Sequence, residues 1–174
     1  MKPLKLVFLI IVLFLTACKQ KEKPIEPNKK PTSTFYLIRH AEKDRSDSLN
    51  LDPHLTEKGL LRAEKWRDIF ENISFDAVYS TDYNRTRETA LPTAIKNNLE
   101  LIIYNPKTIN ITDFLNDNKG KNILIVGHSN TTPTFVNAIL KSETYKDIDD
   151  GNNGNLYTIT INGDKITNSL VFIN

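Results

Sequence analysis

The stretch NILIVGH, residues 122–128, is the clearest buried strand in the sequence, because its middle is apolar and rich in β-branched residues. Its last two residues, a glycine and a histidine, end the strand. Asn130 or Thr131 can then cap a helix that carries an apolar stripe to Leu140. A buried strand followed directly by a helix is typical of a parallel sheet. We therefore expect an α/β domain around this segment.

The same alternation of strand and helix extends outward from this stretch. Further strands are expected at 34–38, 75–79 and 99–104, and helices at 56–70, at 84–96 with a break or bend near Pro92, and at 111–115. The chain ends in two strands around Asn162-Gly163, a hairpin signal. We predict a three-layer α/β/α domain with a mostly parallel central sheet and an antiparallel C-terminal hairpin.

The N-terminus has the layout of a signal peptide. Lys2 and Lys5 precede ten apolar residues, 6–15, which are too few for a membrane-spanning helix of about 20. Residues 15–18, LTAC, resemble the bacterial lipobox, and Cys18 is the only cysteine of the chain. This resemblance implies a lipidated Cys18 that anchors the protein to a membrane of the cell envelope, on its periplasmic or extracellular face. The alternative is an ordinary secretory signal with an incidental cysteine.

The expected domain organisation follows from composition. We assign 1–17 to a lipoprotein signal peptide, 18–33 to the lipidated cysteine and a tether rich in lysine and proline, and 34–174 to the globular domain. Loss of the signal peptide would leave 21 basic against 21 acidic residues. Such a neutral protein offers no electrostatic case for nucleic acid as a partner.

Two histidines and two arginines follow predicted strands. His40 and His128 each stand directly after a strand, where open parallel sheets form their ligand crevice. Arg39 adjoins His40, a helix N-terminus adjoins His128, and Arg85 lies one helical turn beyond another strand. Guanidinium groups and free backbone N–H groups favour anions. The sequence therefore predicts a phosphate site at this edge of the sheet.

Four segments resemble motifs of the histidine phosphatase superfamily, also called the phosphoglycerate mutase-like superfamily. LIRHAE at 37–42 resembles the arginine-histidine-glycine signature, with alanine in place of glycine, and LTEKG at 55–59 resembles the family's helix start. Residues 80–90 resemble the segment that carries the second phosphate arginine, and VGHSN at 126–130 resembles the late glycine-histidine motif. The second arginine aligns with Arg85 rather than Arg87.

The resemblance implies a phosphatase with a phosphohistidine intermediate on His40. Arg39, Arg85 and His128, with Ser129, would bind the phosphoryl group, and water would then release it. No metal or other cofactor is implied. The substrate would be a phosphorylated small molecule or a phosphoprotein, and both its identity and the oligomeric state are left open. The compact chain looks most like the small phosphohistidine phosphatases of the family.

The proton donor to the leaving group is not assigned by a recognisable motif. Glu42, just past the nucleophile, and Asp52, in the following loop, are the candidates, although such carboxylates more often cap helices or face solvent. His54 is a surface residue or a lining residue of the site.

Three other functions are compatible with the same residues. A metal hydrolase could use His40, His128 and Glu42 as ligands, but two nearby guanidiniums would repel the cation. A catalytically silent domain could bind phosphorylated ligands at the cell envelope. A phosphomutase would need its intermediate shielded from water, and the short connection 97–122 leaves little material for a lid.

Overall fold

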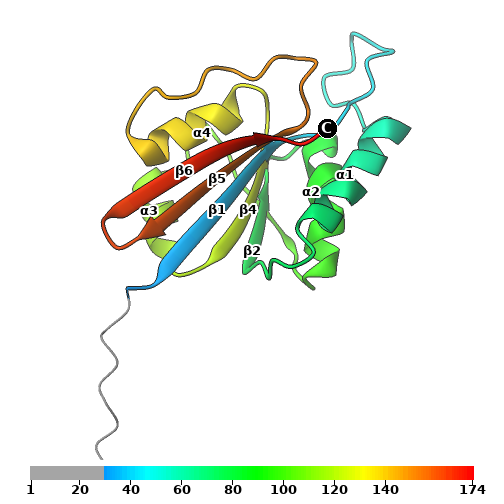
Figure 1. Cartoon of the computed structure of the whole chain (residues 1–174). Helices are drawn as coiled ribbons and strands as arrows, with labels where there is room; N and C mark the ends of the chain where they lie inside the picture. The colour runs from blue at the N-terminus through cyan, green and yellow to red at the C-terminus, as the bar shows by residue number, and fades with distance from the viewer. Residues whose placement is uncertain (1–29) are drawn as a thin grey trace, which may run out of the picture.

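The computed structural model describes residues 30–174, in which six strands and four helices follow the predicted order (Figure 1). The elements are β1 (Thr32–Arg39), α1 (Glu57–Ile69), β2 (Ala77–Ser80), α2 (Asn84–Lys96), β3 (Leu101–Ile103), α3 (Ile111–Asp117), β4 (Asn122–Gly127), α4 (Thr131–Leu140), β5 (Asn155–Asn162) and β6 (Lys165–Phe172). Within this range no helix is long and apolar enough to cross a membrane. The predicted signal peptide, Cys18 and most of the tether lie outside the described residues.

The strands form one sheet in the order β3-β2-β4-β1-β5-β6. The four strands from β3 to β1 pair in parallel, whereas β5 and β6 are antiparallel. Helices α1 and α2 cover one face of the sheet, and α3 and α4 cover the other (Figure 1). The predicted three-layer architecture with a C-terminal hairpin is confirmed.

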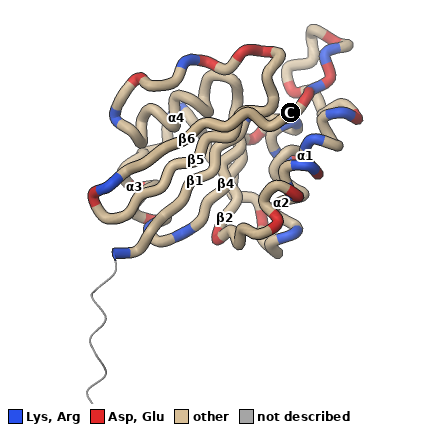
Figure 2. Tube along the Cα trace, viewed as in Figure 1, with Lys and Arg blue, Asp and Glu red and all other residues tan. Residues whose placement is uncertain are grey.

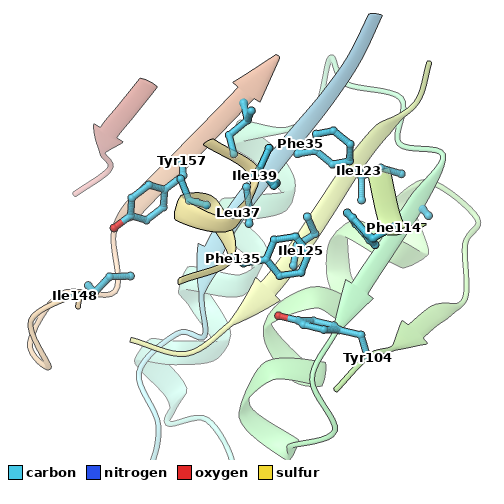
Figure 3. Packing of buried hydrophobic residues seen from close by; sticks show 13 residues of the cluster. Phe35, Leu37, Tyr104, Phe114, Ile123, Ile125, Phe135, Ile139, Ile148 and Tyr157 are labelled. Carbon is cyan, nitrogen blue, oxygen red and sulfur yellow. The ribbon is translucent and has the colours of Figure 1, made fainter. Parts of the chain in front are cut away.

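The continuous apolar run of β4 is explained by burial on both faces of the sheet. Ile123 and Ile125 pack into the cluster beneath α3 and α4, which Figure 3 shows around Phe135. Leu124 and Val126 point the other way, into the cluster beneath α1 and α2. Successive side chains of a strand alternate between faces, so a strand covered on both sides needs apolar residues at every position.

The register of the central strands brings their carboxyl ends level. Arg39 at the end of β1 is paired with Gly127 at the end of β4, and Ser80 of β2 is paired with Val126 of β4. Backbone bonds continue just past the strands, from the His40 N–H to the carbonyl of Gly127 at 2.9 Å. Residues that follow different strands therefore meet at one edge of the sheet.

Three differences between the predicted and the observed elements are the clearest. The first strand begins at Thr32, within the predicted tether, because Thr32 and Ser33 already pair with β5. The hairpin turn consists of Gly163-Asp164, one residue later than predicted, and Gly163 adopts a positive φ of 60°. Helix α2 continues through Pro92 without a break.

Charged side chains are concentrated on the helices and the connecting loops, and the central strands carry few of them (Figure 2). The long connection between α4 and β5 carries both signs. This distribution agrees with a domain that folds around an apolar sheet.

The start of α1 explains the motif at residues 55–59. The Thr56 hydroxyl accepts a hydrogen bond from the Gly59 N–H at 3.1 Å, a typical N-cap. A Cβ atom added at Gly59 would lie 2.2 Å from the carbonyl oxygen of Glu42. Only glycine allows the helix to pack this closely against the segment that follows His40.

Replacing Gly59 with alanine should therefore destabilise the domain. We expect the free energy of unfolding of the Gly59→Ala variant to fall by about 1–3 kcal/mol, because steric displacement outweighs the higher helix propensity of alanine. Urea denaturation followed by circular dichroism measures this change. Lys58→Ala, at an exposed neighbouring position, should change the stability by less than about 0.5 kcal/mol. Equal stabilities of the two variants would contradict the packing argument.

Candidate active site

A cavity of about 850 Å³ opens at the carboxyl ends of the parallel strands. Its lining includes the four residues predicted for the core of the site, Arg39, His40, Arg85 and His128, together with Ser129. The rings of His40 and His128 are 5.5 Å apart between centroids. The structure thus brings together residues that are up to 89 positions apart in the sequence.

His40 is only 4% exposed, and its backbone N–H, its carbonyl and its ring each form a hydrogen bond. Its backbone N–H donates to Gly127, and its carbonyl accepts from Asn153 Nδ2 at 2.8 Å. The ring Nδ1 lies 2.7 Å from the carbonyl oxygen of Ala41, so this nitrogen carries the proton. The other nitrogen, Nε2, is consequently the one with a free lone pair.

Burial and neighbouring charges keep His40 neutral. Burial is the largest cause that lowers its pKa to about 3; the hydrogen bond to the Ala41 carbonyl acts in the opposite direction, and the charges of Arg39 and Arg85 lower the pKa further. An imidazole attacks phosphorus through its unprotonated nitrogen. The same surroundings that disfavour the imidazolium ion therefore preserve the nucleophilic form at neutral pH.

His128 is fixed by a threonine at the end of β2. Its Nε2 lies 2.9 Å from the Thr81 hydroxyl, which is itself 3.0 Å from the hydroxyl of Thr86. The Tyr83 ring stands edge-on to the imidazole at 5.0 Å. Burial, followed by the charges of Arg85 and Arg39, lowers the pKa of His128 to about 4. Both histidines of the cavity are neutral at pH 7.

Arg39 has only 2% of its side chain exposed and uses most of its donors on the loop before β5. Its Nη1 donates to the backbone carbonyls of Asp149, Asp150 and Asn152 at 2.9–3.0 Å. Its Nη2 donates to the carboxylate of Asp150 at 2.7 Å. The guanidinium therefore both anchors this loop and faces the cavity.

Arg85 lies on the first turn of α2, beside the loop 41–55. Its Nη1 is 3.4 Å from the carbonyl of Leu51 and 3.5 Å from the Asp52 carboxylate. The guanidinium also stacks on Tyr83, 4.3 Å from the ring centroid. These contacts hold the charged group at the cavity wall, opposite the loop that Arg39 anchors.

The Nε atoms of Arg39 and Arg85 are both buried, and neither has a hydrogen-bond partner among residues 30–174. A buried N–H without an acceptor is costly and rare in folded proteins. Both guanidiniums line the same cavity as the two histidines. A phosphate bound there would be held by the positive charges of both guanidiniums. Two guanidiniums and two neutral imidazoles on one cavity are the strongest structural indication of an anion site.

Glu42 does not reach the cavity, so the structure argues against its predicted role as proton donor. Its carboxylate accepts three hydrogen bonds of 2.9–3.0 Å from Arg62 of α1 and lies 3.4 Å from Lys58. Burial raises the pKa of Glu42, but the bonds from Arg62 outweigh it and lower the pKa below its ordinary value. An ionised, ion-paired carboxylate holds α1 in place instead.

Asp52 is absent from the cavity lining and caps α2 from outside. Its carboxylate accepts from the backbone N–H of Asn84 at 2.8 Å and faces Arg85. This geometry fits a role in orienting Arg85 better than the proton donation that was predicted for Asp52. His54 is paired with Glu88 on the surface, outside the cavity lining, and this bond raises its pKa.

The sequence reasoning did not single out several other lining residues, among them Lys43, Thr81, Tyr83, Tyr104 and Asp150. Thr81 and Tyr104 follow β2 and β3 directly, so the rule that identified His40 and His128 would also have found them. The hydroxyl of Tyr104 is buried and has no partner within the described part of the chain. Asp150 comes from a loop without a motif, and hydrogen bonds from Arg45 and Arg39 lower its pKa to about 2.

The predicted metal-free chemistry is compatible with this arrangement. In residues 30–174 no group of three or more histidine, cysteine, aspartate or glutamate side chains is placed to hold a metal ion. Glu42, the third ligand of the rival metal site, is instead bonded to Arg62. The cavity offers donors to an anion rather than ligands to a cation.

Comparisons with known proteins point to one class. Residues 35–105 match the model of the histidine phosphatase superfamily (branch 1). This segment contains most of β1, together with His40 and Arg85. No curated protein matches the sequence significantly.

Solved structures extend the likeness to most of the chain. Phosphoglycerate mutase from Bacillus anthracis is 17% identical, with a TM-score of 0.64 over 82% of this chain and 94% of that one. A phosphoserine phosphatase mutant from Entamoeba histolytica is 18% identical, with a TM-score of 0.60 over 79% and 96%. The protein histidine phosphatase SixA, complexed with tungstate, is 10% identical, with a TM-score of 0.62 over 80% and 96%. The fold is phosphoglycerate mutase-like, and the predicted resemblance to the histidine phosphatase superfamily is confirmed.

The lowered pKa values of the two cavity histidines predict a pH-dependent stability. Above pH 6.5 both histidines are neutral in the folded and the unfolded chain, and their contribution is fully present. As the pH falls from 6.5 towards 4, His40 and His128 bind protons in the unfolded chain but stay unprotonated in the folded chain. The free energy of unfolding should therefore fall by about 3–4 kcal/mol between pH 7 and pH 5.

Urea denaturation at several pH values measures this effect, and the third histidine supplies the control. His40→Asn should remove roughly half of the dependence, since one of the two groups no longer titrates. His54→Asn should keep it, because that exposed histidine has a raised pKa. Identical pH profiles for the His40→Asn variant and the unmodified protein would refute the argument.

Proposed function

We propose that this protein hydrolyses phosphomonoesters through a phosphohistidine intermediate on His40. The observation that carries the proposal is one cavity lined by two guanidiniums, those of Arg39 and Arg85, beside the neutral imidazole of His40. The fold and the family of residues 35–105 support it. A phosphorylated small molecule or a phosphoprotein is the substrate.

The first step is the attack of His40 Nε2 on phosphorus. The lone pair of Nε2 forms the P–N bond, the bond from phosphorus to the ester oxygen breaks with its electron pair staying on oxygen, and that oxygen takes a proton from water. The imidazole becomes positively charged, and the carbonyl of Ala41 stabilises this charge through the proton on Nδ1. Arg39, Arg85 and His128 bind the equatorial oxygens, where positioned donors assist phosphoryl transfer most.

The second step releases phosphate. Water attacks phosphorus, the P–N bond breaks and returns its electron pair to Nε2, and the water proton leaves with phosphate or solvent. In the described chain two carboxylates, Asp82 and Asp150, line the cavity. The short connection 97–122 leaves little material for a lid that would exclude water, which favours hydrolysis over transfer to a second substrate.

Turnover of p-nitrophenyl phosphate tests the proposal. We expect the His40→Asn variant to lose at least about 10³-fold in kcat, because the nucleophile is removed. After an alkaline quench during turnover, mass spectrometry should find phosphohistidine on the peptide that contains His40. His54→Asn is the matched control and should retain both the activity and the modified peptide, and the activity should survive a chelator.

Two results would overturn the proposal. One is equal turnover by the His40→Asn variant and the unmodified protein. The other is phosphate on the peptide with His128 or His54 instead of the one with His40.

We further propose that the protein is anchored at the cell envelope through lipidation of Cys18. The support is the apolar run at 6–15 followed by LTAC, with Cys18 as the only cysteine. When the full chain is produced in bacteria with an alkyne-labelled palmitate, the label should appear on the protein, and the protein should sediment with membranes. Cys18→Ser should lose the label and move to the soluble fraction. An unlabelled, soluble unmodified protein would contradict the anchor.

A further inference from the structure

The phosphate cavity continues into a second, apolar hollow. This groove has a volume of about 450 Å³ and shares four lining residues with the cavity, Pro106, Lys107, Asn130 and Thr131. Its other walls are Ile109, Ile111, Thr134, Phe135 and Ala138. The shared residues place the groove where the part of a substrate that is not phosphate would extend.

The groove is built from two ordered elements. One wall is the connection 105–111, folded by bonds from the N–H groups of Lys107 and Ile109 to Asn105, at 2.9 and 3.0 Å. The other wall is α4, on which Thr134 and Ala138 stand one turn apart and exposed. Phe135 forms the floor, with its ring 5.9 Å from that of Tyr104 and 5.2 Å from that of Phe114.

The side chains that line the groove indicate what kind of chemical group it binds. Lys107 is the one charged residue of the groove within the described chain, and it stands where the groove joins the cavity. The rest offers hydrocarbon, with the hydroxyls of two threonines and the amide of Asn130 at the edges. A sugar or a peptide backbone would leave many polar groups without partners there, whereas an alkyl chain would not.

Given the proposed phosphatase activity, we infer that the substrate is a phosphomonoester of an aliphatic alcohol, whose chain lies in this groove while its phosphate lies between Arg39 and Arg85. The groove follows α4 from Thr131 to Ala138, a rise of about 10 Å. This length accommodates roughly eight carbon atoms at ordinary bond lengths. Lys107 stays near the phosphate, at the junction.

A series of primary alkyl phosphates from methyl to decyl, all below their micellar concentrations, tests this inference. We expect kcat/KM to rise about two- to fourfold for each added methylene up to roughly eight carbons, and then to level off, because each buried methylene adds apolar contact. Glucose 6-phosphate and phosphoserine should be turned over no faster than methyl phosphate.

The Ala138→Phe variant, which fills the groove, should lose most of the octyl-to-methyl ratio in kcat/KM. Thr167→Phe, an equally bulky change at an exposed position of β6 remote from the cavity, should keep that ratio. Circular dichroism confirms that both variants fold, and Thr134→Phe repeats the test should Ala138→Phe not fold.

The outcomes separate the two proposals. A flat chain-length series with turnover that depends on His40 would overturn the groove inference and leave the phosphatase function intact. A rising series unaffected by both Ala138→Phe and Thr134→Phe would also overturn it, since the chain would then bind elsewhere. Absence of turnover with every ester would overturn the proposed function and the inference with it.

Discussion

The parallel pairing of β1, β4 and β2 is the constraint on which the rest of the site depends. Its register sets Arg39 level with Gly127 and Ser80 level with Val126. The residues that directly follow these strands therefore lie at the same edge of the sheet. Strand β3 adds Tyr104 by the same rule, through a bond from its N–H to the carbonyl of Ser80 at 3.0 Å. The site is thus a product of hydrogen bonds made in the core.

The positive charges of two guanidiniums buried beside two imidazoles must be compensated, and the compensating groups differ between the two arginines. Arg39 is neutralised by Asp150 and three backbone carbonyls, whereas Arg85 has a more distant carboxylate and an aromatic face. Neither arrangement engages Nε. Burying a cation away from water costs free energy unless its N–H groups find hydrogen-bond acceptors. The loops that satisfy the other donors therefore also hold the free ones in position.

The order of strands and helices, the three layers, the hairpin and the convergence of His40, Arg39, Arg85 and His128 followed from periodicity and from positions at strand ends. These features are local in the sequence, so local patterns reveal them. Asp150, Asn153 and Arg62 could not be found in this way. Their roles depend on contacts more than 100 positions away for the first two, and on a helix packed against a loop for the third. Glu42 was misjudged for the same reason, because nothing near it in the sequence indicates Arg62.

The groove along α4 shows a further limit of strand-end reasoning. Loops 41–55 and 141–154 contribute Lys43 and Asp150 to the cavity lining. The connection 97–122 was predicted to be too short for a lid, yet its residues 105–111, folded by bonds to Asn105, form one wall of the groove. A short connection cannot close over a substrate, but it can shape a permanent binding surface. The site therefore combines access for water with a preformed groove for one apolar substituent. This arrangement suits hydrolysis better than transfer of the phosphoryl group to a second substrate in a closed site.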